Sequence, residues 1–281
     1  MKLAVSNIAW RVDDRLEAYA LLERHGISGL EIAPSLFFHA AADPFAPDDG
    51  PVQAATEEIG RNGLRIVSMQ SLLFGMDGAA LFGGPDERSC LDAAIRRAID
   101  LAGRCRIPNL VFGSPRQRSV PATMTIERAN EIAILAFRSL GDAAAVAECT
   151  IAIEPNPAAY GTNFLTRTRE TLAFVASVDH PAIGLNLDLG ALLMNDELDD
   201  LEALVEAGAG HIAHVHISES HLAPAPEQIE PAARVIEAAR SSGYDRWFSV
   251  EMKAVDEPSL ATLDRSLDRL AMAVAMAGVS A

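Results

Sequence analysis

The chain has 281 residues, of which 23 are basic and 39 acidic, so its formal net charge at pH 7 is −16. A protein this acidic repels phosphate backbones, which argues against general binding of nucleic acids. Apolar residues make up 49% of the chain, which excludes a disordered protein and allows a sizeable core.

Eight short apolar runs rich in β-branched residues predict the strands of the protein. In chain order they are residues 2–7, 29–33, 64–70, 108–113, 150–154, 183–188, 212–218 and 247–252. The runs are almost continuously apolar rather than alternating, as expected for parallel strands buried on both faces. Between them, apolar residues recur at three- and four-residue spacing, for example over 86–104 and 126–148, and predict helices.

Eight strands that each precede a helix predict the α/β class and a (β/α)8 TIM barrel. A doubly wound sheet would more often place a Gly-rich turn after the first strand, where this chain has only residues 7–10, NIAW. No linker-like stretch divides the chain, so we expect residues 1–281 to form a single domain. Segments 40–51 and 72–85 are expected to be long loops, which in compact domains are usually functional.

The cysteines and the N-terminus indicate where the protein works. Cys90, Cys105 and Cys149 form no C-x-x-C pair, and a sparse, odd count is typical of reduced thiols in a cytosolic protein. The apolar run at the N-terminus is too short for a signal peptide. No stretch reaches the roughly 18 apolar residues that a membrane helix needs. We therefore expect a soluble, cytoplasmic protein with no membrane partner.

Polar side chains stand where the last four predicted strands end. They are Glu154, Asp188, His216 and Glu251. Barrel enzymes carry their active sites at this end of the strands. One such acid could simply cap the next helix, but three carboxylates and an imidazole at consecutive strand ends predict a metal site. This donor set suits one divalent cation, with Mn²⁺ favoured and Mg²⁺, Co²⁺ or Zn²⁺ acceptable.

Two histidines on the seventh predicted strand require a choice. His214 and His216 are two residues apart and so point to the same side of the strand. His216 is nearer the end that carries the active site, so we assign it as the ligand and expect His214 to lie deeper in the barrel. Glu31, near the end of the second strand, is expected to contact the site from behind.

The segments around these four residues resemble the metal-ligand set of the xylose-isomerase-like TIM barrels. The segments are IEPNP, NLDLG, HVHISES and SVEMK. The resemblance covers essentially the whole chain and implies a small-molecule sugar or sugar phosphate as substrate. Barrels of this kind often form homodimers. The DNA-repair branch of the superfamily is disfavoured, because it needs more correctly placed histidines than this chain has and because the net charge opposes DNA.

The resemblance implies an isomerase or epimerase that works through an enediolate. A divalent cation bridging a carbonyl and the neighbouring hydroxyl lowers the cost of that enediolate. Glu154 and Glu251 would remove and return the proton, and no organic cofactor is needed. Two alternatives remain open: a dehydratase or lyase on a polyol or keto acid, because the same enediolate precedes elimination, and a non-catalytic sugar-binding barrel.

The chain departs from the family pattern at two histidines. Many relatives read Asp-x-x-His after the sixth strand, whereas Asp188 is followed by Leu-Gly-Ala. His221 could supply an imidazole from the next loop, or it could be a plain loop histidine. Gln70 stands where a histidine often ends the third strand, and an amide can orient a hydroxyl but cannot shuttle protons.

The remaining candidates for substrate contacts follow strands at the same end of the barrel. Arg116 and Arg118 would form a fork for an anionic group, unless they are a solvated loop pair. The aromatic candidates would line a sugar pocket, with ordinary packing as the alternative. Besides Gln70 and His221, the other candidates are Trp10, Phe74, Asn156, Tyr160, Asn163 and Lys253.

Overall fold

The computed structural model of the protein describes residues 1–256 and 259–278. Its parallel strands close into a barrel in the order of the chain, and β8 pairs with β1. The strands are β1 (Leu3–Ser6), β2 (Gly29–Ile32), β3 (Arg65–Met69), β4 (Asn109–Phe112), β5 (Thr150–Ile153), β6 (Ile183–Asp188), β7 (Ile212–Ser218) and β8 (Phe248–Glu251). Each lies within the range predicted for it, and the (β/α)8 barrel is confirmed.

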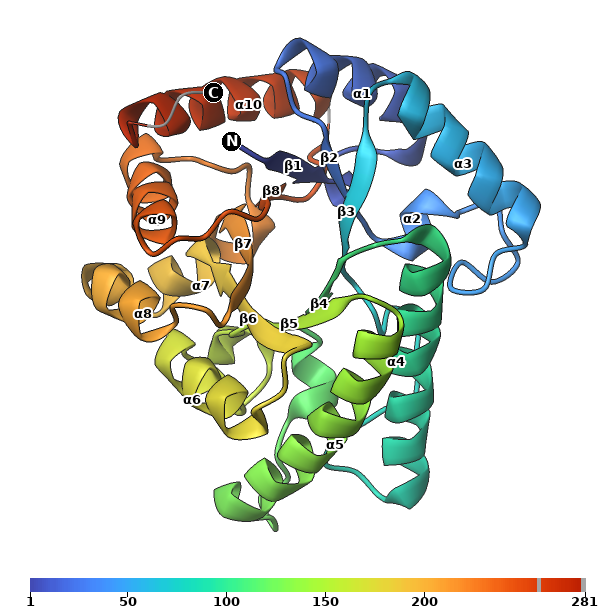
Figure 1. Ribbon diagram of the computed structural model, residues 1–281, viewed down its shortest axis with the longest axis vertical. Helices are drawn as coiled ribbons and strands as arrows, with labels where there is room; N and C mark the ends of the chain where they lie inside the picture. Colours follow the sequence, from blue (N-terminus) through green and yellow to red (C-terminus); the bar gives the residue numbers. More distant parts are fainter. Residues whose placement is uncertain (257–258, 279–281) are drawn as a thin grey trace.

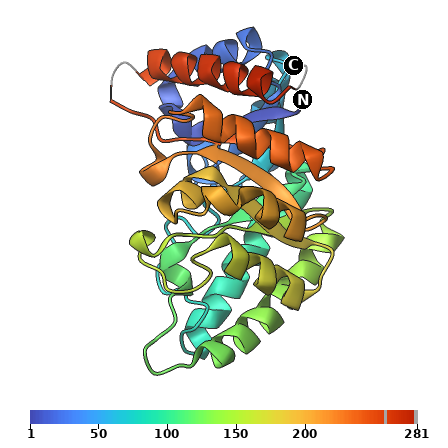
Figure 2. The same ribbon diagram turned by 90° about the vertical axis from the view of Figure 1, so that its left-hand side faces the viewer.

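The longer helices form a ring outside the strands (Figure 1). The helices are α1 (Arg15–Arg24), α2 (Pro34–Phe37), α3 (Asp49–Arg61), α4 (Pro85–Cys105), α5 (Ile126–Val146), α6 (Thr168–Val178), α7 (Leu189–Met194), α8 (Leu201–Ala207), α9 (Ile229–Ser241) and α10 (Ser259–Met276). In the perpendicular view of Figure 2, α10 packs beside α9. Among the described residues, no helix combines the length and the apolar character that crossing a bilayer requires.

The two helices and two loops that were predicted with bounds can be compared directly. The helices over 86–104 and 126–148 correspond to α4 and α5, with ends that differ by at most two residues. The predicted loop over 72–85 runs up to the start of α4. The other loop ends early, because α3 begins at Asp49. Proline in the first turn of a helix is tolerated, which is why Pro51 did not mark the boundary correctly.

The barrel has an apolar shell and a polar interior. Outside the strands, Phe112 on β4 packs edge-on against Phe137 on α5, with ring centroids 5.1 Å apart. Inside, contacts cross the barrel, as between Glu31 on β2 and His216 on β7. The buried polar residues carried by the strands are Ser6, Glu31, Ser68, Asn109, Asn186, Asp188, His214, His216, Ser218, Ser249 and Glu251. These groups make the interior a site for polar chemistry rather than a purely apolar core.

The register of the strands brings the predicted ligands to one level. Asp188 on β6 pairs with His216 on β7, and Ser218 on β7 pairs with Glu251 on β8. Glu154 directly follows β5, with its backbone N–H donating to Phe112 O of β4 at 3.1 Å. Because parallel strands end at the same edge, all four side chains reach the carboxyl-end mouth of the barrel.

Candidate metal centre and substrate cavity

Glu154, Asp188, His216 and Glu251 converge in one cluster. One donor atom from each residue lies within 4.8 Å of the donors of the others. The Nδ1 atom of His216 lies 3.2 Å from Glu154 Oε1, 3.6 Å from Asp188 Oδ2 and 3.3 Å from Glu251 Oε2. The four side chains predicted as ligands are therefore brought together around a single ring nitrogen.

The charges of this cluster fit a divalent cation. Three carboxylates this close repel one another unless positive charge lies between them. In the part of the chain that the structure describes, His216 is the only basic side chain within ion-pair distance of Glu154, Asp188 or Glu251. One imidazole cannot balance three carboxylates, whereas three oxygen donors and one nitrogen donor are a suitable set for a divalent metal.

The same charges shift the pKa values of the cluster. Burial alone would lower the pKa of His216, but the surrounding carboxylates, Glu31 and Glu251 foremost, raise it well above its usual value. Burial raises the pKa of Glu251 to about 7 against the opposing effect of His216. Burial also opposes ionisation of Glu154, but hydrogen bonding and the charge of His216 outweigh it and lower that pKa. The space beside Nδ1 of His216 therefore attracts positive charge.

Two asparagine amides hold the carboxylate of Glu154. The Nδ2 atom of Asn186 donates to Glu154 Oε1 at 2.8 Å, and that of Asn156 donates to Oε2 at 2.8 Å. Asn186 was not nominated from the sequence. It lies two residues before Asp188 on β6, so the alternation of side chains along a strand would have placed it on the same inner face.

Asp188 both caps a helix and faces the cluster. Its Oδ1 accepts the backbone N–H of Ala191 at 2.6 Å, which caps the N-terminus of α7. Its Oδ2, which faces His216, accepts the hydroxyl of Ser218 at 2.6 Å. The capping role that a strand-end acid can take is therefore present here, and it leaves the second oxygen directed at the cluster.

A cavity of about 500 Å³ lies at the cluster. The carboxylates of Glu154, Asp188 and Glu251 form part of its wall. Five of the residues nominated for substrate contacts also line it, namely Arg116, Asn156, Tyr160, His221 and Lys253. Ser218, Glu219 and Leu222 line it too, without having been nominated. Ser218 could have been predicted from the sequence, because it lies two residues after His216 and therefore on the same face of the strand.

The other nominated residues that follow the first and third strands lie in an adjoining cavity. Trp10, Gln70 and Phe74 line a hollow of about 510 Å³ that shares Leu222 and Lys253 with the first cavity. The Phe74 side chain is 68% exposed, whereas Trp10 is only 3% exposed. None of these three residues lines the cavity at the carboxylate cluster, and the Nε2 of Gln70 donates to Ser6 Oγ at 2.6 Å and Glu31 Oε1 at 3.1 Å.

Arg118 and Asn163 do not reach either cavity. Arg118 is completely buried, and its Nη2 donates to the carbonyls of Glu154 at 2.8 Å and Leu165 at 3.3 Å. Burial lowers the pKa of Arg118 to about 10. The expected fork of Arg116 and Arg118 therefore does not form, because only Arg116 enters the cavity. The side chain of Asn163 is committed to the backbone N–H and carbonyl of Val120, at 2.7 Å and 3.0 Å.

The loop after β7 holds a strained turn against the cavity. His221 and Leu222 both have left-handed backbone conformations, with φ of 60° and 58°. Two successive non-glycine residues in this region cost energy and persist only where contacts enforce them. Here the His221 N–H donates to Tyr160 Oη at 2.9 Å, and the Leu222 carbonyl accepts from Lys253 N at 2.9 Å. These two contacts fix His221 and Leu222 in the cavity wall.

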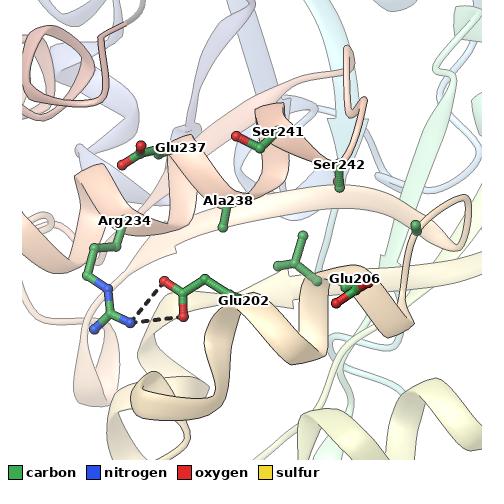
Figure 3. Close-up of a pocket in the computed structure, with 9 residues that line it drawn as sticks. Glu202, Glu206, Arg234, Glu237, Ala238, Ser241 and Ser242 are labelled. Atoms are coloured by element: carbon green, nitrogen blue, oxygen red, sulfur yellow. Dashed lines mark hydrogen bonds and ion pairs between the residues drawn. The ribbon is translucent and has the colours of Figure 1, made fainter.

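A further hollow of about 420 Å³ lies on the helical ring between α8 and α9 (Figure 3). Its polar groups include Glu202 and Arg234, whose Nη2 pairs with Glu202 Oε1 at 3.0 Å. It shares no lining residue with the cavity at the carboxylate cluster. The ion pair is at the surface, where such pairs contribute little.

A family model of the xylose isomerase-like TIM barrel matches residues 19–272. No curated protein matches the chain. Similar solved structures include a D-psicose 3-epimerase with D-tagatose from Clostridium cellulolyticum H10, with a TM-score of 0.79, 17% identity and 99% of both chains covered.

Two further solved structures show the same fold. A 3-keto-D-glucoside 4-epimerase from E. coli has a TM-score of 0.77 and 15% identity, over 98% of this chain and 99% of that one. A D-allulose 3-epimerase from Methylomonas sp. has a TM-score of 0.75 and 21% identity, over 99% of this chain and 98% of that one. At these identities the likeness establishes a shared fold along the whole chain.

Proposed function

Because the chain belongs to the xylose isomerase-like TIM barrels, we propose that it isomerises or epimerises a sugar or sugar derivative with one divalent metal ion. The observation that carries the proposal is the convergence of Glu154, Asp188, His216 and Glu251 beside a cavity of about 500 Å³. This volume is in the range of small-molecule sites. Sugar epimerases among the similar structures support the reaction class.

The four clustered residues would hold the metal ion, with Mn²⁺ favoured. A divalent cation there would polarise a substrate carbonyl and the neighbouring hydroxyl, which would make the proton on the hydroxyl-bearing carbon next to the carbonyl easier to remove. Glu154 and Glu251 are the pair for proton transfer. They come from β5 and β8, with two strands between them, so they approach the substrate from different directions.

Other residues of the cavity would bind and orient the sugar. Arg116 and Lys253 would hold an anionic group or hydroxyls, and Asn156 and Tyr160 would bind further hydroxyls. His221 lines the cavity and would supply an imidazole there. Position 191, where many relatives carry a histidine, is alanine in this chain.

The adjoining cavity would receive a part of the substrate that does not react. Trp10, Gln70 and Phe74 line that cavity, and Lys253 borders both cavities. An aromatic wall suits the face of a second sugar unit or another substituent.

Hydrogen exchange in D2O tests the proposal. The protein, loaded with Mn²⁺, is incubated with ketoses, 3-keto sugars and their phosphates, and deuterium next to the carbonyl is measured by NMR. We expect exchange with the wild type, and none without metal or in Glu154→Gln and Glu251→Gln. Glu202→Gln, in the hollow between α8 and α9, is the matched control and should exchange like the wild type.

A product that has lost water would identify a dehydratase or lyase instead. A sugar that binds without any exchange would identify a non-catalytic binding barrel. Failure of the wild type to retain a stoichiometric divalent ion after supplementation would contradict the metal requirement.

A further inference from the structure

A buried carboxylate lies behind the candidate metal centre. Glu31, on β2, is fully buried inside the barrel. Its Oε1 lies 3.2 Å from Nε2 of His216, and its Oε2 lies 3.2 Å from Nε2 of His214. Gln70 Nε2 donates to Oε1 at 3.1 Å. Because a buried carboxylate is costly unless it is paired and hydrogen-bonded, these contacts explain how Glu31 is tolerated, but not what it does.

The two ring nitrogens of His216 point in different directions. Nε2 faces the carboxylate of Glu31, an acceptor, so this nitrogen must carry a hydrogen. Nδ1 lies 3.1 Å from Nδ2 of Asn186, a donor, and 3.2, 3.6 and 3.3 Å from the carboxylates of Glu154, Asp188 and Glu251. A cation held by those carboxylates would therefore meet the lone pair of this nitrogen. The orientation of the Asn186 amide is set by its bond to Glu154 Oε1 at 2.8 Å. Because Nε2 directs its hydrogen at Glu31, Nδ1 is the ring nitrogen left to bind a metal.

We propose that Glu31 is a positioning residue for the metal centre. By accepting the Nε2–H of His216, it fixes the tautomer and the ring orientation that direct Nδ1 at the carboxylates of Glu154, Asp188 and Glu251. A carboxylate behind a ligating histidine also makes the ring a stronger ligand. This inference rests on the metal site of the proposed function, and it adds a residue from the first half of the barrel to that site.

A purely structural role for Glu31 makes a different prediction. Ser249 belongs to the same buried network, since its hydroxyl contacts Nε2 of His214 at 2.9 Å, and it is fully buried. If Glu31 only stabilised the interior, removing either group would disturb metal binding to a similar extent. If Glu31 acts through His216, only its removal weakens the metal. Ser249→Ala is therefore the matched control.

Metal affinity separates the two roles. Free Mn²⁺ is followed by EPR while the ion is titrated into metal-free wild type, Glu31→Gln and Ser249→Ala, with circular dichroism as the check on folding. Glu31→Gln keeps the shape of the side chain and removes its charge. We expect its Kd for Mn²⁺ to rise by about 10- to 100-fold, and that of Ser249→Ala to stay at the wild-type value. A Glu31→Gln variant with the wild-type Kd overturns the inference.

A second measurement needs no variant and can overturn the inference even if Glu31→Gln fails to fold. In the Zn²⁺-loaded wild type, ¹⁵N–¹H correlation of the histidine rings should show His216 with its proton on Nε2 and the metal at Nδ1. A ring that binds Zn²⁺ through Nε2 overturns the inference. Wild-type protein that binds no divalent ion overturns the proposed function and the inference with it, whereas an unaffected Glu31→Gln overturns the inference alone.

Discussion

Gly113 lies directly against the carboxylate of Glu154. A Cβ added at Gly113 would stand 2.6 Å from Glu154 Oε2 and 3.4 Å from Asn156 Oδ1. Gly113 is the first residue after β4, so the backbone at the end of one strand forms the wall behind the side chain at the end of the next. The space that Glu154 occupies exists because position 113 has no side chain.

Gly113→Ala should therefore weaken metal binding by pushing Glu154 out of place. We expect the Kd for Mn²⁺ to rise by about 10-fold or more, as it does when a residue that positions a metal ligand is changed. Overpacking should also lower the free energy of unfolding by about 1–3 kcal/mol. Isothermal titration and urea unfolding measure the two effects. Gly60→Ala is the control, because an added Cβ there, in α3, meets nothing within 4 Å. Unchanged Mn²⁺ affinity in Gly113→Ala would show that Glu154 does not bind the ion from this position.

His221 should matter for turnover and not for the metal. It faces the cavity from a turn that Tyr160 holds, and it is outside the donor cluster. If its imidazole transfers a proton, His221→Ala lowers kcat by about 10²- to 10⁴-fold while the Kd for Mn²⁺ stays constant. The exposed His211, which lines neither cavity, gives the control His211→Ala. Wild-type kcat in His221→Ala would return His221 to the role of an ordinary loop residue.

Substitution of Arg118 should lower the stability of the protein, whereas substitution of Arg116 should weaken substrate binding. Arg118→Met leaves the buried carbonyls of Glu154 and Leu165 without this donor and should lower the free energy of unfolding by about 1–3 kcal/mol. Arg116→Met, at an exposed position, should change stability by less than about 0.5 kcal/mol but raise KM for a sugar that carries an anionic group. Urea unfolding and steady-state kinetics measure the two effects. The reverse assignment of effects would contradict the structure of this loop.

Cys149 should make the protein less stable at alkaline pH. Burial raises the pKa of its thiol from 9.0 to about 11. Between these values the unfolded chain releases the proton and the folded protein keeps it, so the stability that the neutral thiol contributes is lost as the pH rises. By pH 10 the loss amounts to about 1.4 kcal/mol relative to neutral pH.

Urea unfolding from pH 7 to pH 10 of wild type, Cys149→Ala and Cys90→Ala measures this loss. The half-buried Cys90 has no comparable environment, so Cys90→Ala should lose stability like the wild type. Cys149→Ala should lose about 1.4 kcal/mol less than the wild type over this range. Parallel curves for wild type and Cys149→Ala would mean that the thiol ionises as readily in the folded protein as in the unfolded chain.

The strands and the clustered ligands could be predicted from the sequence because their signals are local. Glu154, Asp188, His216 and Glu251 are polar residues at or next to the ends of apolar runs, and parallel strands bring such ends to one edge. Asn186 and Ser218 were equally within reach, because each lies two residues from a nominated ligand on the same strand.

The loop residues could not be sorted in this way. Arg116 and Arg118 lie two residues apart in one short turn, yet only the second is buried. Its burial depends on the carbonyls of Glu154 and Leu165, which a different part of the chain brings over it. Asn163 is likewise committed to Val120, 43 residues away in the chain. No pattern within a loop records which other loop will cover it.

The contact between Glu31 and His216 joins the two halves of the chain. Every donor of the metal cluster belongs to the half-barrel from β5 to β8, whereas Glu31 belongs to the half from β1 to β4. A fragment holding only the second half-barrel would carry a full set of donors but no acceptor for Nε2 of His216. The two half-barrels could be produced separately and mixed. Tighter metal binding by the β5–β8 half would then report that the β1–β4 half had docked in its native register.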